Sequence, residues 1–272
     1  MPLSPTIRPS AWPHLNDPAL MPTIGEALDA AARKLAETSN TPRLDARILL
    51  AHAAGLSPEV LLGERGRFLE SVQEATFTAV MDRRIAGEPV SRIVGHREFW
   101  SLEFVVTRDV LDPRPDSETL VDALLTAVPD RSARLRILDL GTGTGCLLLA
   151  ALSEYPNAWG VGIDRSPPAA AIAHANAARL GFGSRASFAV ANWGDALGAQ
   201  FDAILCNPPY IPTSDMARLP REVVRHDPHL ALHGGQDGLN EYRSLAPVLA
   251  RALSPSGCAV VELGAGQSDD VS

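Results

Sequence analysis

The stretch ILDLGTGTGCL, from Ile137 to Leu147, decides the fold. Its first apolar residues predict a buried strand, and the glycines Gly141, Gly143 and Gly145 follow directly. Such a turn lets the backbone approach a ligand, and the helix after it offers free N–H groups. A dinucleotide fingerprint reads Gly-x-Gly-x-x-Gly, whereas the third glycine comes one residue earlier here. The stretch predicts a strand, a binding turn and a helix, although any tight turn also favours glycines.

Strands and helices alternate from Arg134 onward. Strands are predicted at 134–140, 158–164, 186–192, 201–206 and 257–264, and helices at 146–155, 167–181 and 238–253. This alternation is typical of βαβ units in a parallel sheet. A preceding helix is predicted to be capped by Asp116 or Ser117. We therefore expect an α/β, Rossmann-like domain over residues 113–272.

The chain before this domain has a different character. Residues 1–22 are rich in proline and are expected to form a flexible extension, with Met21 as an alternative start of translation. Residues 23–88 show helical periodicity, with Thr23 as a cap and Gly55 and Gly87 as stops, so we expect a small helical bundle. Residues 89–112 alternate like strands and predict a β-hairpin linker that turns near Ser101.

Composition excludes several classes of protein. The 272 residues carry a net charge of −8, which argues against tight binding of nucleic acid. Three scattered cysteines without a Cys-x-x-Cys pattern favour buried thiols in a reducing cytoplasm. No run is apolar enough to span a membrane, and no signal-peptide pattern opens the chain. The neighbouring His226, His229 and His233 lack matched acidic ligands, so no metal site is predicted.

Acidic residues at two strand ends suggest the ligand. Asp164 ends the strand after the glycine turn, where an acid accepts hydrogen bonds from ribose hydroxyls. Asp139 precedes the turn that contains Thr142; it either caps that turn or favours the cationic tail of S-adenosylmethionine over a pyrophosphate. After the next strand, Asn192 and Trp193 fall where an adenine ring would lie, although Trp193 fits a core position equally well. S-adenosylmethionine is therefore the predicted cofactor.

The motif Asn207-Pro208-Pro209-Tyr210 closes the following strand, at the same edge of the sheet. The side-chain oxygen of Asn207 and the carbonyl of Pro208 can accept the two N–H groups of an amide or aromatic amine. Prolines stiffen the turn, and Tyr210 can lay its ring on the planar acceptor. These residues are predicted to catalyse methyl transfer by positioning the nitrogen. The alternative is a capped strand end with Tyr210 buried.

Several segments resemble the protein-(glutamine-N5) methyltransferases of the PrmC/HemK type. They are RLDARILLAHAAGL (43–56), GEPVSRIVGHREFWSLEFVVTRDVLDPRPDSE (87–118), ILDLGTGTGCLLLA (137–150), NPPYI (207–211) and DPHLALHGGQDGLNEYRSL (227–245). The resemblance implies a class I methyltransferase fold that modifies the glutamine of a Gly-Gly-Gln loop on class I peptide chain release factors, giving N5-methylglutamine.

Residue roles follow from the same resemblance. Gly141, Gly143, Asp164, Asn192 and Asn207 would line the S-adenosylmethionine site, with Asp139, Thr142, Gly145 and Trp193 predicted beside them. Asn207 and Pro208 would bind the glutamine amide next to Pro209 and Tyr210. Arg114, Pro115, Phe99 and Trp100 would border the same pocket. The helical domain would dock the release factor, and we expect a monomer.

Two features depart from the family pattern. Members usually carry Asp where this chain has Asn192, and an amide can still contact adenine. Members also continue beyond the position of Ser272 with a helix and two antiparallel strands, so we expect a truncated C-terminal edge that exposes the sheet.

Other functions stay open at this point. A DNA amino-methyltransferase, acting on adenine N6 or cytosine N4, would use the same four residues on a flipped base. Such an enzyme should carry a basic recognition region, and the chain has no run of Lys or Arg. A non-catalytic module that docks the release factor is a second alternative. An NAD-dependent oxidoreductase is a third, without a residue set for hydride transfer.

Overall fold

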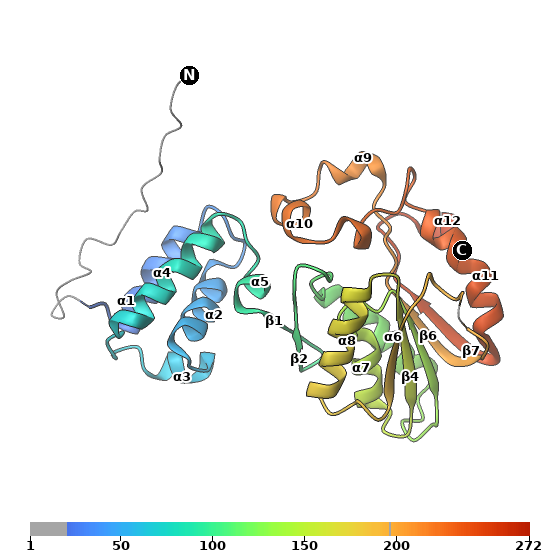
Figure 1. Cartoon of the computed structure of the whole chain (residues 1–272). Coiled ribbons are helices and arrows are strands. Elements are labelled where there is room, and N and C mark those ends of the chain that lie inside the picture. Colours follow the sequence, from blue (N-terminus) through green and yellow to red (C-terminus); the bar gives the residue numbers. More distant parts are fainter. Residues whose placement is uncertain (1–20, 196) are drawn as a thin grey trace. The chain divides into compact units, whose positions relative to one another are not determined.

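The computed structural model describes residues 21–195 and 197–272 (Figure 1). The predicted flexible extension over 1–22 therefore lies outside the described residues except for its last two positions. The chain divides into two compact units, one that ends at Val94 and one that begins at Gly95. This division falls inside the segment predicted as a linker.

The first unit is a helical bundle, as its periodicity predicts. Its helices are α1 (Ile24–Leu35), α2 (Pro42–Ala54), α3 (Pro58–Gly63), α4 (Ser71–Ile85) and α5 (Val90–Val94). Thr23 and Glu26 form a reciprocal capping box, and Gly55 ends α2 in the left-handed conformation. A buried ion pair between Arg84 and Asp45, 2.8 Å long, joins α4 to α2. The unit has an apolar core of its own.

The predicted hairpin linker is only partly a hairpin. Residues 90–94 form α5, because Pro89 suits a helix start and Ile93 packs into the helical core. The hairpin consists of β1 (His96–Phe99) and β2 (Leu102–Val105), which are antiparallel and belong to the second unit. Trp100 and Ser101 both have positive φ, the geometry of a tight two-residue hairpin turn.

The second unit contains a parallel sheet, which confirms the predicted α/β class. Its strands are β3 (Arg136–Leu140), β4 (Trp159–Asp164), β5 (Ala186–Val190), β6 (Phe201–Cys206) and β7 (Leu253–Val261), in the order β5-β4-β3-β6-β7. The chain runs outward from β3 through β4 to β5 and then returns to β6 on the other side of β3. Ligands bind at such a reversal, beyond the carboxyl ends of the strands.

Helices cover both faces of this sheet (Figure 1). Because side chains alternate along a strand, Ile137 of β3 faces α6 (Glu118–Ala127) and α7 (Cys146–Glu154), whereas Leu138 faces α11 (Asn240–Ala252). Helix α8 (Pro167–Arg179) follows β4. The remaining short elements, which sequence periodicity did not predict, are η2 (Pro115–Ser117), α9 (Thr213–Met216), α10 (Arg221–His226), η3 (His229–Ala231) and α12 (Ser268–Val271).

Within residues 21–195 and 197–272, no helix is both long and apolar enough to cross a membrane. The same residues contain no cluster of His, Cys, Asp and Glu that could hold a metal ion. All three cysteines are free thiols, with Cys206 buried and Cys146 and Cys258 half-buried.

Candidate functional site

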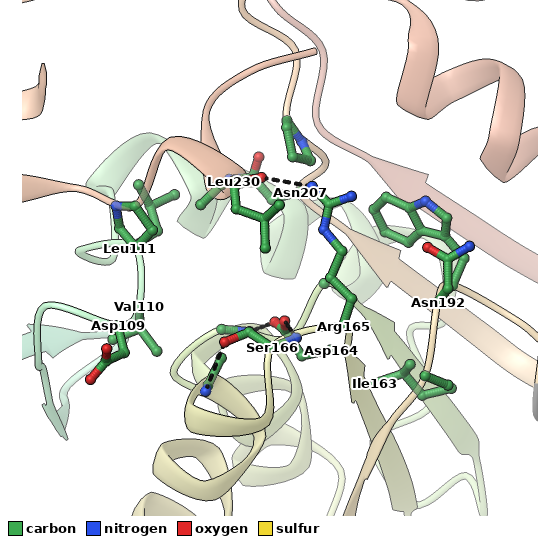
Figure 2. Close-up of a pocket in the computed structure, with 18 residues that line it drawn as sticks. Asp109, Val110, Leu111, Ile163, Asp164, Arg165, Ser166, Asn192, Asn207 and Leu230 are labelled. Carbon is green, nitrogen blue, oxygen red and sulfur yellow. Dashed lines mark hydrogen bonds between the residues drawn. The ribbon is translucent and has the colours of Figure 1, made fainter. Parts of the chain in front are cut away.

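A pocket opens beyond the carboxyl ends of β3, β4, β5 and β6, within the second unit (Figure 2). Its space, counted together with the open solvent at its mouth, is about 730 Å³. The lining residues include Asp109–Leu111, Gly141, Gly143, Ile163–Ser166, Ala191–Trp193, Asn207, Pro209, Pro228, Leu230 and Ala231. Arg165 crosses one side, where its guanidinium donates to the carbonyl of Leu230 at 3.1 Å.

The glycine turn forms the floor of the pocket and holds an acid. Gly141 has φ of 75°, and a Cβ there would lie 3.5 Å from the ring of Trp193, so ring and backbone are nearly in contact. The N–H of Gly143 donates to Asp164 Oδ2 at 2.9 Å, and the N–H of Ser166 donates to Oδ1 at 2.9 Å. Each oxygen of Asp164 keeps further acceptor capacity toward the pocket.

Three residues predicted at the cofactor lie beneath the turn instead. Asp139 is 1% exposed because the alternation of β3 turns it into the protein, and its Oδ2 accepts from the Thr142 hydroxyl at 2.6 Å. Its Oδ1 has no hydrogen-bond partner among the described residues, and burial raises the pKa of this carboxyl to about 7. Gly145 precedes α7, where a Cβ would lie 3.3 Å from Ala173 of α8. Asp139 is therefore buried beneath the turn and is not part of the pocket lining.

The residues predicted at the adenine ring do line the pocket. Figure 2 shows Asn192 on the loop after β5, across the pocket from Val110 and Leu111. Trp193 lines the pocket and also packs against the core between the sheet and α11. Its indole N–H donates to Glu241 at 2.9 Å, which fixes the ring beside the glycine turn.

The Asn-Pro-Pro-Tyr turn leaves β6 at the rim of the pocket. Asn207 and Pro209 line the pocket, and Pro208 is buried. The side-chain amide of Asn207 donates from Nδ2 to the Ser117 hydroxyl at 2.9 Å. Tyr210 is half-buried outside the lining, and its hydroxyl donates to Glu262 Oε1 at 3.2 Å. Burial, reinforced by the charge of Glu262, raises the pKa of Tyr210 to about 12, so its hydroxyl stays protonated.

Four residues predicted to border the pocket are placed elsewhere. Phe99 is 1% exposed and belongs to the core beneath α6 and α7, since alternation along the hairpin turns it inward. Trp100 packs on the same core and donates its indole N–H to Glu154 at 2.8 Å. Arg114 pairs with the carboxylate of Asp227, and Pro115 begins η2 at the surface. This ion pair joins the DPRPDSE segment to the loop that lines the pocket through Pro228.

Sequence reasoning missed two residues that contact the Asn-Pro-Pro-Tyr turn. Ser117 was predicted as one of two candidate helix caps, and it does occupy the N-cap position of α6, but within the described chain neither its side chain nor that of Asp116 caps the helix. Its hydroxyl donates instead to Glu262 Oε2 at 2.5 Å. Glu262 directly follows β7, and an acid after a strand end was the signal that identified Asp164.

The arrangement suits a nucleoside-like ligand beside a planar polar group. The carboxylate of Asp164 offers acceptors for hydroxyl groups, and Trp193 contributes an aromatic ring next to bare backbone. At the rim, the side-chain nitrogen of Asn207 donates a hydrogen bond to Ser117, and the side-chain oxygen remains available as an acceptor. The structure thus brings together Gly141, Gly143, Asp164, Asn192, Trp193, Asn207 and Pro209 among the residues predicted for the site.

Comparisons with known proteins give matches along most of the chain. Residues 26–95 match a family model described as the PrmC N-terminal domain, and residues 131–232 match one described as a methyltransferase domain. Three proteins named release factor glutamine methyltransferase are similar. That of Rhodospirillum rubrum is 47% identical (91% of this chain, 76% of that protein), that of Bradyrhizobium diazoefficiens 42% (95% and 88%), and that of Caulobacter vibrioides 43% (92% and 86%).

Proposed function

The chain belongs to the release factor glutamine methyltransferase family, and from this premise and the geometry of the pocket we propose its reaction. It transfers a methyl group from S-adenosylmethionine to the side-chain amide nitrogen of the glutamine in the Gly-Gly-Gln motif of class I peptide chain release factors. The observation that carries the proposal is that Asn207 lines a pocket that suits a nucleoside and donates its side-chain nitrogen to Ser117, so that its side-chain oxygen can accept from an amide.

The residues of the pocket fit S-adenosylmethionine. Asp164 would accept hydrogen bonds from the ribose hydroxyls, with its own geometry fixed by the N–H groups of Gly143 and Ser166. Asn192 and Trp193 would hold the adenine, and the backbone at Gly141 leaves room for close approach. When bound, the cofactor supplies a methyl group on a sulfonium sulfur, which makes that methyl carbon electrophilic.

Asn207 and Pro208 would hold the acceptor amide. An amide nitrogen is a poor nucleophile because its lone pair is delocalised, so its orientation matters more than its basicity. The oxygen of Asn207 and the carbonyl of Pro208 each accept one of its two N–H groups. They also offset positive charge that develops on this nitrogen, whose proton then leaves to water. Within this proposal Tyr210 supports the turn from outside the lining.

The release factor is the partner that follows from this reaction. The relatives carry release factor in their names, and the net charge of −8 fits a protein acceptor better than a duplex. We also propose that the helical unit over 23–88 contacts the release factor, and its match to the PrmC N-terminal domain supports this role.

Methyl transfer to a panel of acceptors tests the proposal. The purified chain is incubated with S-adenosylmethionine labelled in its methyl group and with a class I release factor, the same factor with the motif glutamine replaced by glutamate, or duplex DNA. Label is expected on the unaltered factor alone. Label on duplex DNA would favour the amino-methyltransferase alternative, and label on the altered factor would contradict the assignment of the glutamine.

A further inference from the structure

We propose that Ser117 and Glu262 act as positioning residues for Asn207: together they form a hydrogen-bond relay that turns the oxygen of the Asn207 amide toward the acceptor substrate. We refer to Ser117, Glu262 and Asn207 as the amide relay. The inference deepens the proposed function and rests on it for the role of Asn207, but the relay itself is a property of the folded chain that can be measured without turnover.

The amide relay joins three distant segments at one edge of the sheet. Asn207 Nδ2 donates to Ser117 Oγ at 2.9 Å, and Ser117 Oγ donates to Glu262 Oε2 at 2.5 Å. The ladder pairs Cys206 of β6 with Val261 of β7, so Asn207 and Glu262 leave the sheet side by side. The N–H of Glu262 donates to the carbonyl of Cys206 at 2.9 Å, which extends this register to Glu262 itself.

Counting protons fixes the direction of the relay. A carboxylate only accepts hydrogen bonds, and each oxygen of Glu262 receives one hydroxyl, from Ser117 and from Tyr210. The one hydroxyl hydrogen of Ser117 is therefore used in the hydrogen bond to Glu262. The oxygen of Ser117 can then only accept, so the Asn207 amide must present its NH₂ group to it.

Packing alone would not set this orientation. The oxygen and nitrogen of an amide have nearly the same size, so a half-turn of the Asn207 side chain changes little in shape. The half-turn would instead present a donor to the donors of the substrate amide and would lose a bond to Ser117. The negative charge of Glu262 opposes this by making the Ser117 oxygen an acceptor.

The placement of Ser117 supports a role beyond helix capping. Ser117 is 3% exposed at the N-cap position of α6, where serine normally bonds to the first turn. Its hydroxyl instead donates a hydrogen bond to the carboxylate of Glu262, which lies 145 positions later in the chain. If the bond between Ser117 and Glu262 only held α6 to the end of β7, its loss would not change the orientation of the Asn207 amide. If the bond positions Asn207, its loss would change that orientation. The two roles can therefore be separated by experiment.

The test compares Glu262→Gln, Ser117→Ala, Ser117→Thr and the double variant Ser117→Ala with Glu262→Gln. An amide at position 262 can donate to Ser117, which removes the constraint on Asn207. We expect the kcat for methylation of the release factor to fall about tenfold in Glu262→Gln and in Ser117→Ala. The Kd for S-adenosylmethionine should stay unchanged, and Ser117→Thr, which keeps the hydroxyl, should keep the wild-type rate.

The double variant identifies the relay. Because Glu262 acts through Ser117, Glu262→Gln should add no further loss once Ser117 is Ala. Ser117→Ala also separates this effect from the bond between Glu262 and Tyr210, which it leaves in place. Glu154→Gln is the matched control: Glu154 accepts the Trp100 indole N–H at 2.8 Å in the same unit, and its neutralisation should leave kcat unchanged.

A readout without turnover keeps the relay testable if the proposed function fails. The side-chain NH₂ signals of Asn207, assigned in ¹⁵N-labelled protein by their loss in Asn207→Asp, should shift in Ser117→Ala and Glu262→Gln and stay in place in Glu154→Gln. A wild-type chain that methylates no release factor would overturn the proposed function alone. Unmoved NH₂ signals, wild-type kcat in both single variants, or losses that multiply in the double variant would each overturn the relay.

Discussion

Two aspartates at the ends of neighbouring strands have different environments. Asp164 is fixed by two backbone N–H groups and faces the pocket. Asp139 is buried under the turn, where it bonds to the Thr142 hydroxyl through one oxygen only. Desolvation raises the pKa of Asp139 to about 7, and the nearby charge of Asp164 adds to the rise. At the residue scale, the depth of an acid decides whether it faces the pocket or is desolvated inside the fold.

The buried acid gives the protein a pH-dependent stability. Between its ordinary pKa near 4 and about 7, the folded state holds a proton on Asp139 that the unfolded state has released. Over that range this group should lower the free energy of unfolding by up to about 1.4 kcal/mol per pH unit as the pH rises. Its full contribution is present below about pH 4, and the loss is complete above about pH 7.

Asp139→Asn cannot titrate and should flatten this dependence. Urea denaturation at about pH 5 and about pH 8 gives the free energy of unfolding of the wild type and of the variant. The contributions of the other titrating groups are the same in both proteins and cancel when the two pH dependences are subtracted. The wild type should lose more stability between the two conditions than the variant. Parallel losses would show that Asp139 is already charged in the folded protein.

At the scale of elements, α7 packs closely against the sheet. Gly160 of β4 allows this approach: a Cβ there would lie 2.4 Å from Leu148 of α7 and 2.8 Å from the carbonyl oxygen of Ile137 in β3. The second contact is with backbone, which cannot rotate away. A side chain at this position would therefore push α7 away from β4 and strain the pairing of β4 with β3.

Gly160→Ala should destabilise the protein by about 1–3 kcal/mol, the usual cost of overpacking a core. Gly183→Ala serves as its control, because a Cβ there would meet only Ala178 Cα at 3.9 Å. Urea unfolding followed by circular dichroism compares the two variants. Equal stability of both would mean that β4 and α7 can separate without penalty.

The elements with local signals were predictable, and those that depend on distant residues were not. The Thr23 cap, the Gly55 stop and the strand before Gly141 each follow from neighbouring residues in sequence. The inward position of Phe99 depends on the core that α6 and α7 provide. The bond from Ser117 to Glu262 depends on a residue 145 positions away, so nothing local distinguishes this serine from a helix cap.

At the scale of the whole molecule, each unit carries its own apolar core, and the pocket lies entirely in the second. Its lining residues come from distant parts of that unit, including Asp164, Asn192 and Asn207. The pocket therefore exists only when β3, β4, β5 and β6 have paired. Composition and motif order predicted the class of reaction, whereas only the assembled sheet shows which residues contact Asn207.

The central claim is that Asn207 presents an acceptor oxygen to a glutamine amide while Asp164 holds the cofactor. The most direct measurement is a single-turnover rate of methylation, with the methyl group located on the release factor by mass spectrometry and the cofactor Kd measured on the same samples. Asn207→Ala should lose about 100-fold or more in rate with little change in Kd, whereas Asp164→Ala should mainly weaken cofactor binding. Transfer to the glutamine at the wild-type rate by Asn207→Ala would contradict the claim, as would a methyl group located on any other side chain.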